Sequence, residues 1–226
     1  MQPKEELTTA RLRAPRAAAI AGILFAILLM AGLGLIRLAV PANPLEAGAW
    51  LQTRLNTVVL ALNLVPFAGI AFLWFMGVVR AHLGSQEDQF FSTVFYGSGL
   101  LFLAMIFLSA ALAGGMLSAY SISPSVLDES GVITFGRTVV YTITNVYAIR
   151  MAGVFMLSLG TIWIRTRTMP RIFVVITYFL ALVLLVVINF SLWVIMVFPA
   201  WVMTVSIYIL AVTMRNNPSA AARAGE

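Results

Sequence analysis

Arg150 is the charged residue that lies inside an apolar segment long enough to cross a bilayer, and it is the first candidate for a polar centre. Insertion scales give such an arginine a cost of roughly 2.5 to 3.5 kcal/mol, so the guanidinium must face protein, a water-filled cavity or an anion. On a helical wheel, Tyr147 shares its face. One interpretation is an anionic ligand or lipid headgroup at Arg150; the other is a structural bond to backbone carbonyls exposed at helix kinks.

Pro66 interrupts another apolar segment and is the second feature that could contribute to a site. It removes one backbone hydrogen bond and leaves the carbonyl of Leu62 without its helical partner, next to the polar side chain of Asn63. If Arg150 used that carbonyl, Asn63, Pro66 and Arg150 would form one polar cluster, as in transporters whose broken helices line a binding site. The alternative is an ordinary proline kink, with Asn63 bonding to a neighbouring helix.

The residue types that most other chemistry requires are scarce. The chain has no Cys and one His, which excludes disulfides and thiolate nucleophiles and leaves little to bind zinc or haem, so we expect no metal and no cofactor. General acid–base catalysis needs titratable groups, and the apolar segments contain no Asp, Glu, His or Lys. No nucleophile elbow, P-loop or dinucleotide fingerprint occurs. The sequence therefore predicts a protein that is not an enzyme.

The composition predicts an all-α integral membrane protein with a single domain. Hydrophobic residues make up 62% of the 226 residues, charged residues make up 10%, and the mean hydropathy is +1.00. A hydrocarbon core of about 30 Å requires about 20 apolar residues per helix. We expect a basic tail over 1–16, a membrane domain over 17–214 and a polar tail over 215–226. The predicted bundle has six transmembrane helices, at residues 17–36, 57–79, 90–117, 138–164, 170–188 and 194–214, and the last two are joined by a hairpin at 189–193.

Basic residues flank these predicted helices unevenly. If the amino terminus is cytoplasmic, ten Lys and Arg residues lie inside and only Arg37, Arg54 and Arg137 lie outside, as the positive-inside rule expects. Both termini are then cytoplasmic, and we expect a bacterial cytoplasmic (inner) membrane. The net charge of +6 comes from these flanking positions, so nucleic-acid binding is not expected.

Three of the cytoplasmic arginines are clustered between the fourth and fifth predicted helices. Arg165, Arg167 and Arg171 most simply fix the topology, and they are also candidates for binding anionic lipid headgroups, at about 1 kcal/mol per charge.

Small residues at every fourth position mark faces where helices can approach closely, as in Ala18, Gly22 and Ala26, and again in the pairs Ala110/Gly114 and Ala111/Gly115. Such contacts lie within one bundle or between chains, so a homo-oligomer or a membrane-protein partner is compatible with them. By elimination, we expect a non-enzymatic binding, scaffold or accessory subunit. The alternative is a small transporter or channel with an anionic substrate or lipid near Arg150.

Overall fold

A computed structural model describes the backbone of residues 3–41, 49–83, 89–123, 131–186 and 193–215, and side chains over 16–41, 53–80, 90–123, 131–186 and 193–215. The elements in chain order are α1 (Pro3–Ala39), α2 (Ala49–Leu83), α3 (Gln89–Ile122), α5 (Val132–Thr142), the π-helix η2 (Ile143–Ala148), α6 (Ile149–Thr166), α7 (Arg171–Val186), the 3₁₀-helix η3 (Val194–Met196) and α8 (Val197–Arg215). Within these ranges, the predicted all-α fold is confirmed.

Five helices in the described part of the chain are long and apolar enough to cross a membrane. They cover Arg16–Ala39, Thr53–Arg80, Phe90–Ile122, Val132–Thr166 and Val194–Arg215. The sixth helix, α7, is also apolar but has 16 residues, which extend about 24 Å at 1.5 Å per residue. By the length and composition of its helices, the chain is a multi-pass membrane protein in contact with lipid. Most of the predicted hairpin at 189–193 lies outside the described residues.

Helical structure extends further than the predicted apolar segments. α1 begins at Pro3, inside the segment expected to be a tail, and α3 continues to Ile122. The loop expected between residues 118 and 137 is shorter than predicted, because α5 already begins at Val132. Apolar content shows where a helix can contact lipid, whereas backbone hydrogen bonding continues until the chain turns. Before α5, Gly131 has a φ of +71°, a left-handed conformation that glycine adopts without steric cost.

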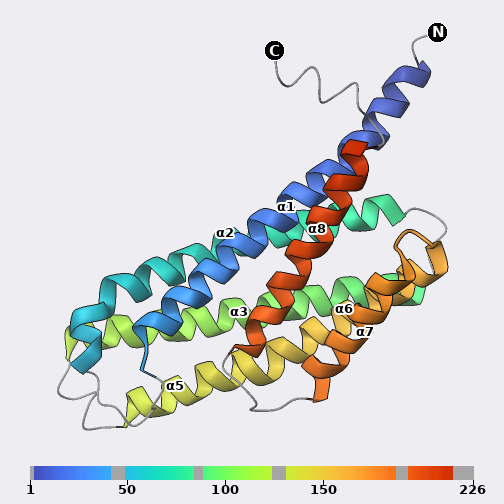
Figure 1. The fold of residues 1–226 in the computed structure, drawn as a ribbon. Coiled ribbons are helices and arrows are strands. Elements are labelled where there is room, and N and C mark those ends of the chain that lie inside the picture. Colours follow the sequence, from blue (N-terminus) through green and yellow to red (C-terminus); the bar gives the residue numbers. More distant parts are fainter. Residues whose placement is uncertain (1–2, 42–48, 84–88, 124–130, 187–192, 216–226) are drawn as a thin grey trace.

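The long helices run up and down the bundle, so their ends form two groups (Figure 1). At one end, Arg80 of α2 lies over the ring of Tyr96 of α3 at 4.9 Å, and Arg165 of α6 lies over Phe91 of α3 at 4.7 Å. α1 starts at this end and α8 finishes there. We call it the basic end, defined by Arg16, Arg80, Arg165, Arg167, Arg171 and Arg215. The described arginines at the opposite end are Arg37, Arg54 and Arg137.

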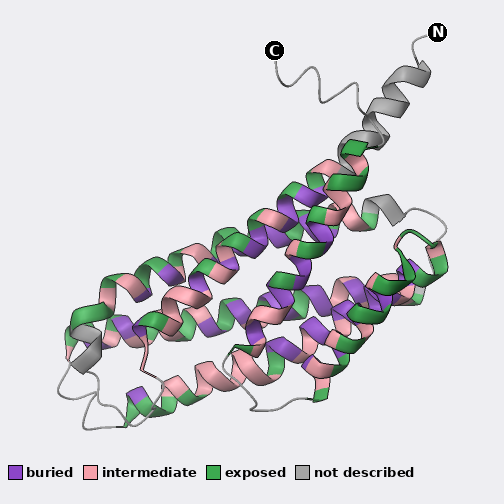
Figure 2. Ribbon diagram, viewed as in Figure 1, coloured by how far each residue is buried: buried purple, intermediate pink, exposed green. Residues whose placement is uncertain are grey.

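The centre of the bundle is filled by phenylalanine rings, and Phe155 of α6 packs against those of α2 and α8. Four of these rings lie next to the cavity described below. We call this group the aromatic plug: Phe25 of α1, Phe72 of α2, Phe102 of α3 and Phe198 of α8, all buried. The ring centroids of Phe25 and Phe72 are 4.5 Å apart, and those of Phe102 and Phe198 are 4.7 Å apart. Such pairs contribute about 0.5 to 1.5 kcal/mol beyond area burial. Figure 2 shows buried residues on the facing sides of the helices and exposed residues on their outer sides.

Glycines on α6 let α7 approach closely along the outer side of the bundle. A Cβ atom at Gly153 would lie 2.9 Å from Cγ of Leu185 and 3.1 Å from the carbonyl oxygen of Ala181, both in α7. Two turns along, Gly160 faces Thr177 and Tyr178, where a Cβ atom would lie at ordinary contact distances of 3.4 and 3.8 Å. Of the glycines singled out from the sequence, Gly22 packs against α2 and α8 inside the bundle, whereas Gly114 and Gly115 face open space.

Candidate functional site

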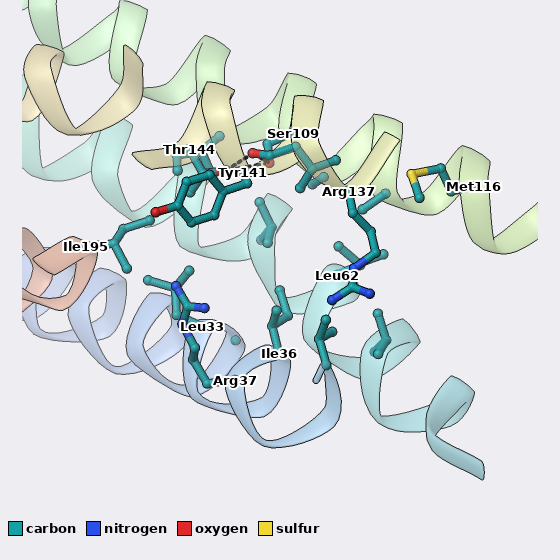
Figure 3. Close-up of a pocket in the computed structure, with 18 of the residues that line it drawn as sticks. Leu33, Ile36, Arg37, Leu62, Ser109, Met116, Arg137, Tyr141, Thr144 and Ile195 are labelled. Atoms are coloured by element: carbon teal, nitrogen blue, oxygen red, sulfur yellow. Dashed lines mark hydrogen bonds between the residues drawn. The ribbon is translucent and has the colours of Figure 1, made fainter. Parts of the chain in front are cut away.

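A cavity of about 500 Å³ lies in the half of the bundle away from the basic end. It is lined by α1, α2, α3, α5 and η2, with η3 at its inner end (Figure 3). Its volume falls within the range of about 300 to 1,000 Å³ that is typical of small-molecule sites. The wall residues are mostly aliphatic: Leu29, Leu33, Ile36, Val40, Val58, Leu62, Val65, Ile106, Ala110, Ala113, Met116, Leu117, Ile133, Val140 and Ile195.

The inner end of the cavity is apolar and rests on the aromatic plug. Leu29, Ile106 and Ile195 form part of this floor. Each lies three or four residues from a plug ring on the same chain segment, so Phe25, Phe102 and Phe198 lie about one helical turn beyond the floor. The plug therefore separates the cavity from the basic end.

Two arginines line the cavity, at different places along it. Arg37 of α1 and Arg137 of α5 are both part-buried and line the wall, and Nη2 of Arg137 donates a hydrogen bond of 2.8 Å to the carbonyl oxygen of Pro41. Figure 3 shows the Arg37 guanidinium and the Tyr141 hydroxyl on the side of the cavity where Ile195 lies, whereas Arg137 lies on the side of Met116. Nearby, Arg54 of α2 donates to the carbonyl oxygen of Leu38. Arg54 thus satisfies a carbonyl in the last turn of α1 and Arg137 one just beyond it, where the helix dipole favours positive charge.

Polar side chains halfway along the cavity are bonded to one another and to the backbone. Oγ of Ser109 and Oγ1 of Thr144 are 2.6 Å apart, and Thr144 donates to the carbonyl oxygen of Val140 at 2.8 Å. Nδ2 of Asn145 donates to the carbonyl oxygen of Tyr141 at 3.0 Å. Thr144 and Asn145 belong to the π-helix η2, a rare element that is frequent at functional sites. The hydroxyl groups of Ser109 and Thr144 therefore already have polar partners within the protein.

The structure does not bring the four predicted polar-centre residues together in the cavity. Arg150 is part-buried, and its Nη1 donates a 3.2 Å hydrogen bond to the carbonyl oxygen of Val146 in η2. Among the described side chains, those that line the cavity do not include Arg150. Asn63 and Pro66 are exposed on α2, whereas their neighbours Leu62 and Val65 face the cavity.

Tyr147 is also directed outward, with 55% of its side chain exposed. The observed bond from Arg150 to Val146 is of the kind expected for the structural interpretation, since it joins the guanidinium to a backbone carbonyl where the regular helix is interrupted.

The predicted headgroup residues Arg165, Arg167 and Arg171 are all exposed at the basic end. Arg167 ends α6 in a left-handed conformation with a φ of 52°, which turns the chain toward α7. Their role in binding lipid headgroups stays a prediction.

Sequence reasoning assigned Arg37 and Arg137 only to the flanks of predicted helices and so missed their place in the cavity. One signal was available: Tyr141 follows Arg137 by four residues, which puts both on one face of a helix. Nothing in the sequence indicated that α1 and α5 enclose a common space. Among the described residues, no group of three His, Cys, Asp or Glu side chains could hold a metal ion.

Comparison of the chain with protein families, with curated proteins and with solved structures gave no match. The site is therefore characterised by its own geometry: a largely apolar cavity in a multi-pass membrane protein, with aromatic rings beyond its inner end and two arginines in its wall.

Proposed function

We propose that this is a non-enzymatic membrane protein whose work is binding, and that its cavity holds a ligand with an apolar body. The observation that carries this proposal is the cavity itself, with a volume of about 500 Å³ and a largely aliphatic wall. Burial of an apolar ligand surface stabilises a complex by about 25 cal/mol per Å². The hydrogen bonds among Ser109, Thr144 and Val140 support an apolar ligand, because binding it would leave none of these groups unsatisfied.

We place the basic end in the cytoplasm, with both termini on that side, and count α7 as the sixth transmembrane helix. The charge distribution supports this orientation, since six of the described arginines lie at the basic end and three at the opposite end. In this orientation the cavity lies in the outer half of a bacterial cytoplasmic membrane. A homo-oligomer or a membrane-protein partner would fit a role as scaffold or accessory subunit.

A small transporter is the second candidate. The π-helix η2 supports it, because interrupted helices often line transport sites. The aromatic plug favours binding instead: transport would require Phe25, Phe72 and their neighbours to separate and open a path to the basic end. Flux of an anionic substrate into proteoliposomes would favour transport, and binding without flux would favour the first candidate.

Filling the cavity tests the proposed function. Ala113 of α3 lines the wall, whereas Ala111, two residues away on the same helix, is exposed and lies outside the cavity. The binding of a fluorescent alkyl ligand should be saturable in nanodiscs containing the natural protein. We expect Ala113→Phe to abolish saturable binding and Ala111→Phe to retain it. Equal binding by the two variants, or no saturable binding by the natural protein, would refute the proposal.

A further inference from the structure

We infer that the outer face of α2 is the contact surface between two copies of this chain, with Asn63 of one copy hydrogen-bonded to Asn63 of the other. We call this surface the α2 seam and define it by five exposed residues: Leu60, Asn63, Phe67, Ile70 and Trp74. The inference does not depend on a ligand in the cavity, because the cavity is lined by the opposite side of α2, at Val58, Leu62 and Val65.

Asn63 places an amide in the hydrocarbon layer without a hydrogen-bond partner. At 1.5 Å per residue, it lies about 14 Å along α2 from Arg54 and about 26 Å from Arg80, the two charges that flank this apolar segment. Within the part of the chain that the structure describes, its amide bonds to no other group. By contrast, the exposed hydroxyl of Thr204 on α8 donates a 2.9 Å hydrogen bond to the carbonyl oxygen of Ala200. An unpaired amide in an apolar medium is costly, so Asn63 indicates that another molecule covers this face.

A second copy of the chain supplies the matching group at the same depth. The amide nitrogen of asparagine donates and the amide oxygen accepts, so two facing Asn63 side chains satisfy each other. Two copies with the same orientation in the membrane are related by a two-fold axis along the membrane normal, which sets their α2 helices parallel and brings Asn63 opposite Asn63. Asparagine pairs of this kind fix the register of parallel coiled coils, and asparagine also forms hydrogen bonds between membrane helices.

The α2 seam has the residue spacing of a helix pair. Its members are separated by three, four, three and four residues, which keeps them on one narrow strip of the helix. The exposed fractions of Leu60, Phe67 and Trp74 are 54%, 61% and 68%, so large apolar side chains lie on both sides of Asn63 along the strip. Gly77 continues the spacing and faces open space, which permits close approach of two backbones. These side chains can therefore pack around an amide pair and exclude lipid from it.

Association in lipid tests this inference. Labelled protein is reconstituted in liposomes at decreasing protein-to-lipid ratio, and single-molecule photobleaching measures the fraction of dimer. We expect the natural protein to change reversibly from dimer to monomer on dilution. Asn63→Leu should need about tenfold higher protein density for the same dimer fraction, which corresponds to the loss of one amide pair between membrane helices. Phe67→Ala should also weaken association, whereas Phe179→Ala, which removes a ring that is 65% exposed on α7, is the matched control and should not.

Disulfide formation locates the contact on the helix. The chain has no Cys, so a single introduced cysteine reports on one position. Ile70→Cys keeps Asn63 and should form a disulfide between two copies on oxidation in liposomes, whereas Phe179→Cys should not. A natural protein that is monomeric at every density, unchanged association of Asn63→Leu, or equal crosslinking of the two cysteine variants would overturn the inference. Each of these results would leave the proposed function in place, because binding of the alkyl ligand is measured separately.

Discussion

Replacing Thr177 by valine tests how α7 is attached to the bundle. Nε1 of Trp201 in α8 donates a 2.9 Å hydrogen bond to Oγ1 of Thr177 in α7. Both residues are buried, with 0% of Thr177 and 4% of Trp201 exposed. Valine has nearly the same shape as threonine but accepts no hydrogen bond, so Thr177→Val leaves the indole N–H without a partner in an apolar setting.

Two reference values bound the loss of stability expected for Thr177→Val. An unsatisfied buried donor costs about 1 to 3 kcal/mol, whereas hydrogen bonds between membrane helices average about 0.6 kcal/mol in mutant cycles. We expect Thr177→Val to lower the free energy of unfolding by about 1 to 2 kcal/mol. Trp201→Phe also removes ring contacts, such as the one with Trp163 at a centroid distance of 5.8 Å, and should cost more. The double variant should cost about 1 kcal/mol less than the sum of the two single variants.

The assay is equilibrium unfolding in mixed micelles, followed by circular dichroism during titration with a denaturing detergent. All four proteins of the cycle are measured under one set of conditions. Additive effects, or a Thr177→Val variant as stable as the natural protein, would show that the indole bond does not hold α7 in place and would refute this reasoning.

Two further predictions concern the backbone. Gly153→Ala should destabilise the protein by about 1 to 3 kcal/mol, because the new Cβ atom meets Leu185 and the Ala181 carbonyl. Gly114 has open space around it, so Gly114→Ala should be neutral or slightly stabilising. Thermal melts of the two variants measure the difference. Similar melting temperatures for these two alanine variants would contradict close packing of α7 on α6. Arg167→Gly should raise the free energy of unfolding by up to about 1 kcal/mol and so raise the melting temperature, because a left-handed conformation costs a non-glycine residue about 1 to 2 kcal/mol. A lower melting temperature would mean that the arginine side chain stabilises the protein by more than the backbone strain costs.

Hydropathy predicted much of the fold, because a bilayer requires long apolar helices and leaves few alternatives. It did not predict which face of a helix would be buried. In a soluble helix the polar face is exposed, but in lipid both faces of α2 are apolar. The sequence therefore left open whether Asn63 and Pro66 join a polar cluster or mark an ordinary kink, and the structure places both on the exposed face.

The candidate site was harder to predict than the fold. Arg150 was singled out because it stands alone within an apolar segment, whereas Arg37 and Arg137 resembled ordinary flanking charges. Their meeting at one cavity depends on how α1 and α5 are arranged in space, and residue spacing along a single helix carries no such information. The glycines of α6 that accept α7 were also missed, because Gly153 and Gly160 are seven residues apart and the small-residue pattern considered had a spacing of four.

The central claim is that an alkyl chain occupies the cavity above the aromatic plug. Its most direct test is photo-crosslinking with a diazirine-bearing alkyl ligand in nanodiscs, with the labelled residues mapped by peptide mass spectrometry. We predict saturable labelling of the cavity-lining residues within 106–117 of α3 and 29–41 of α1, and its loss in Ala113→Phe. Labelling that does not saturate and is confined to outward-facing residues such as Phe67 and Trp74 would contradict the claim.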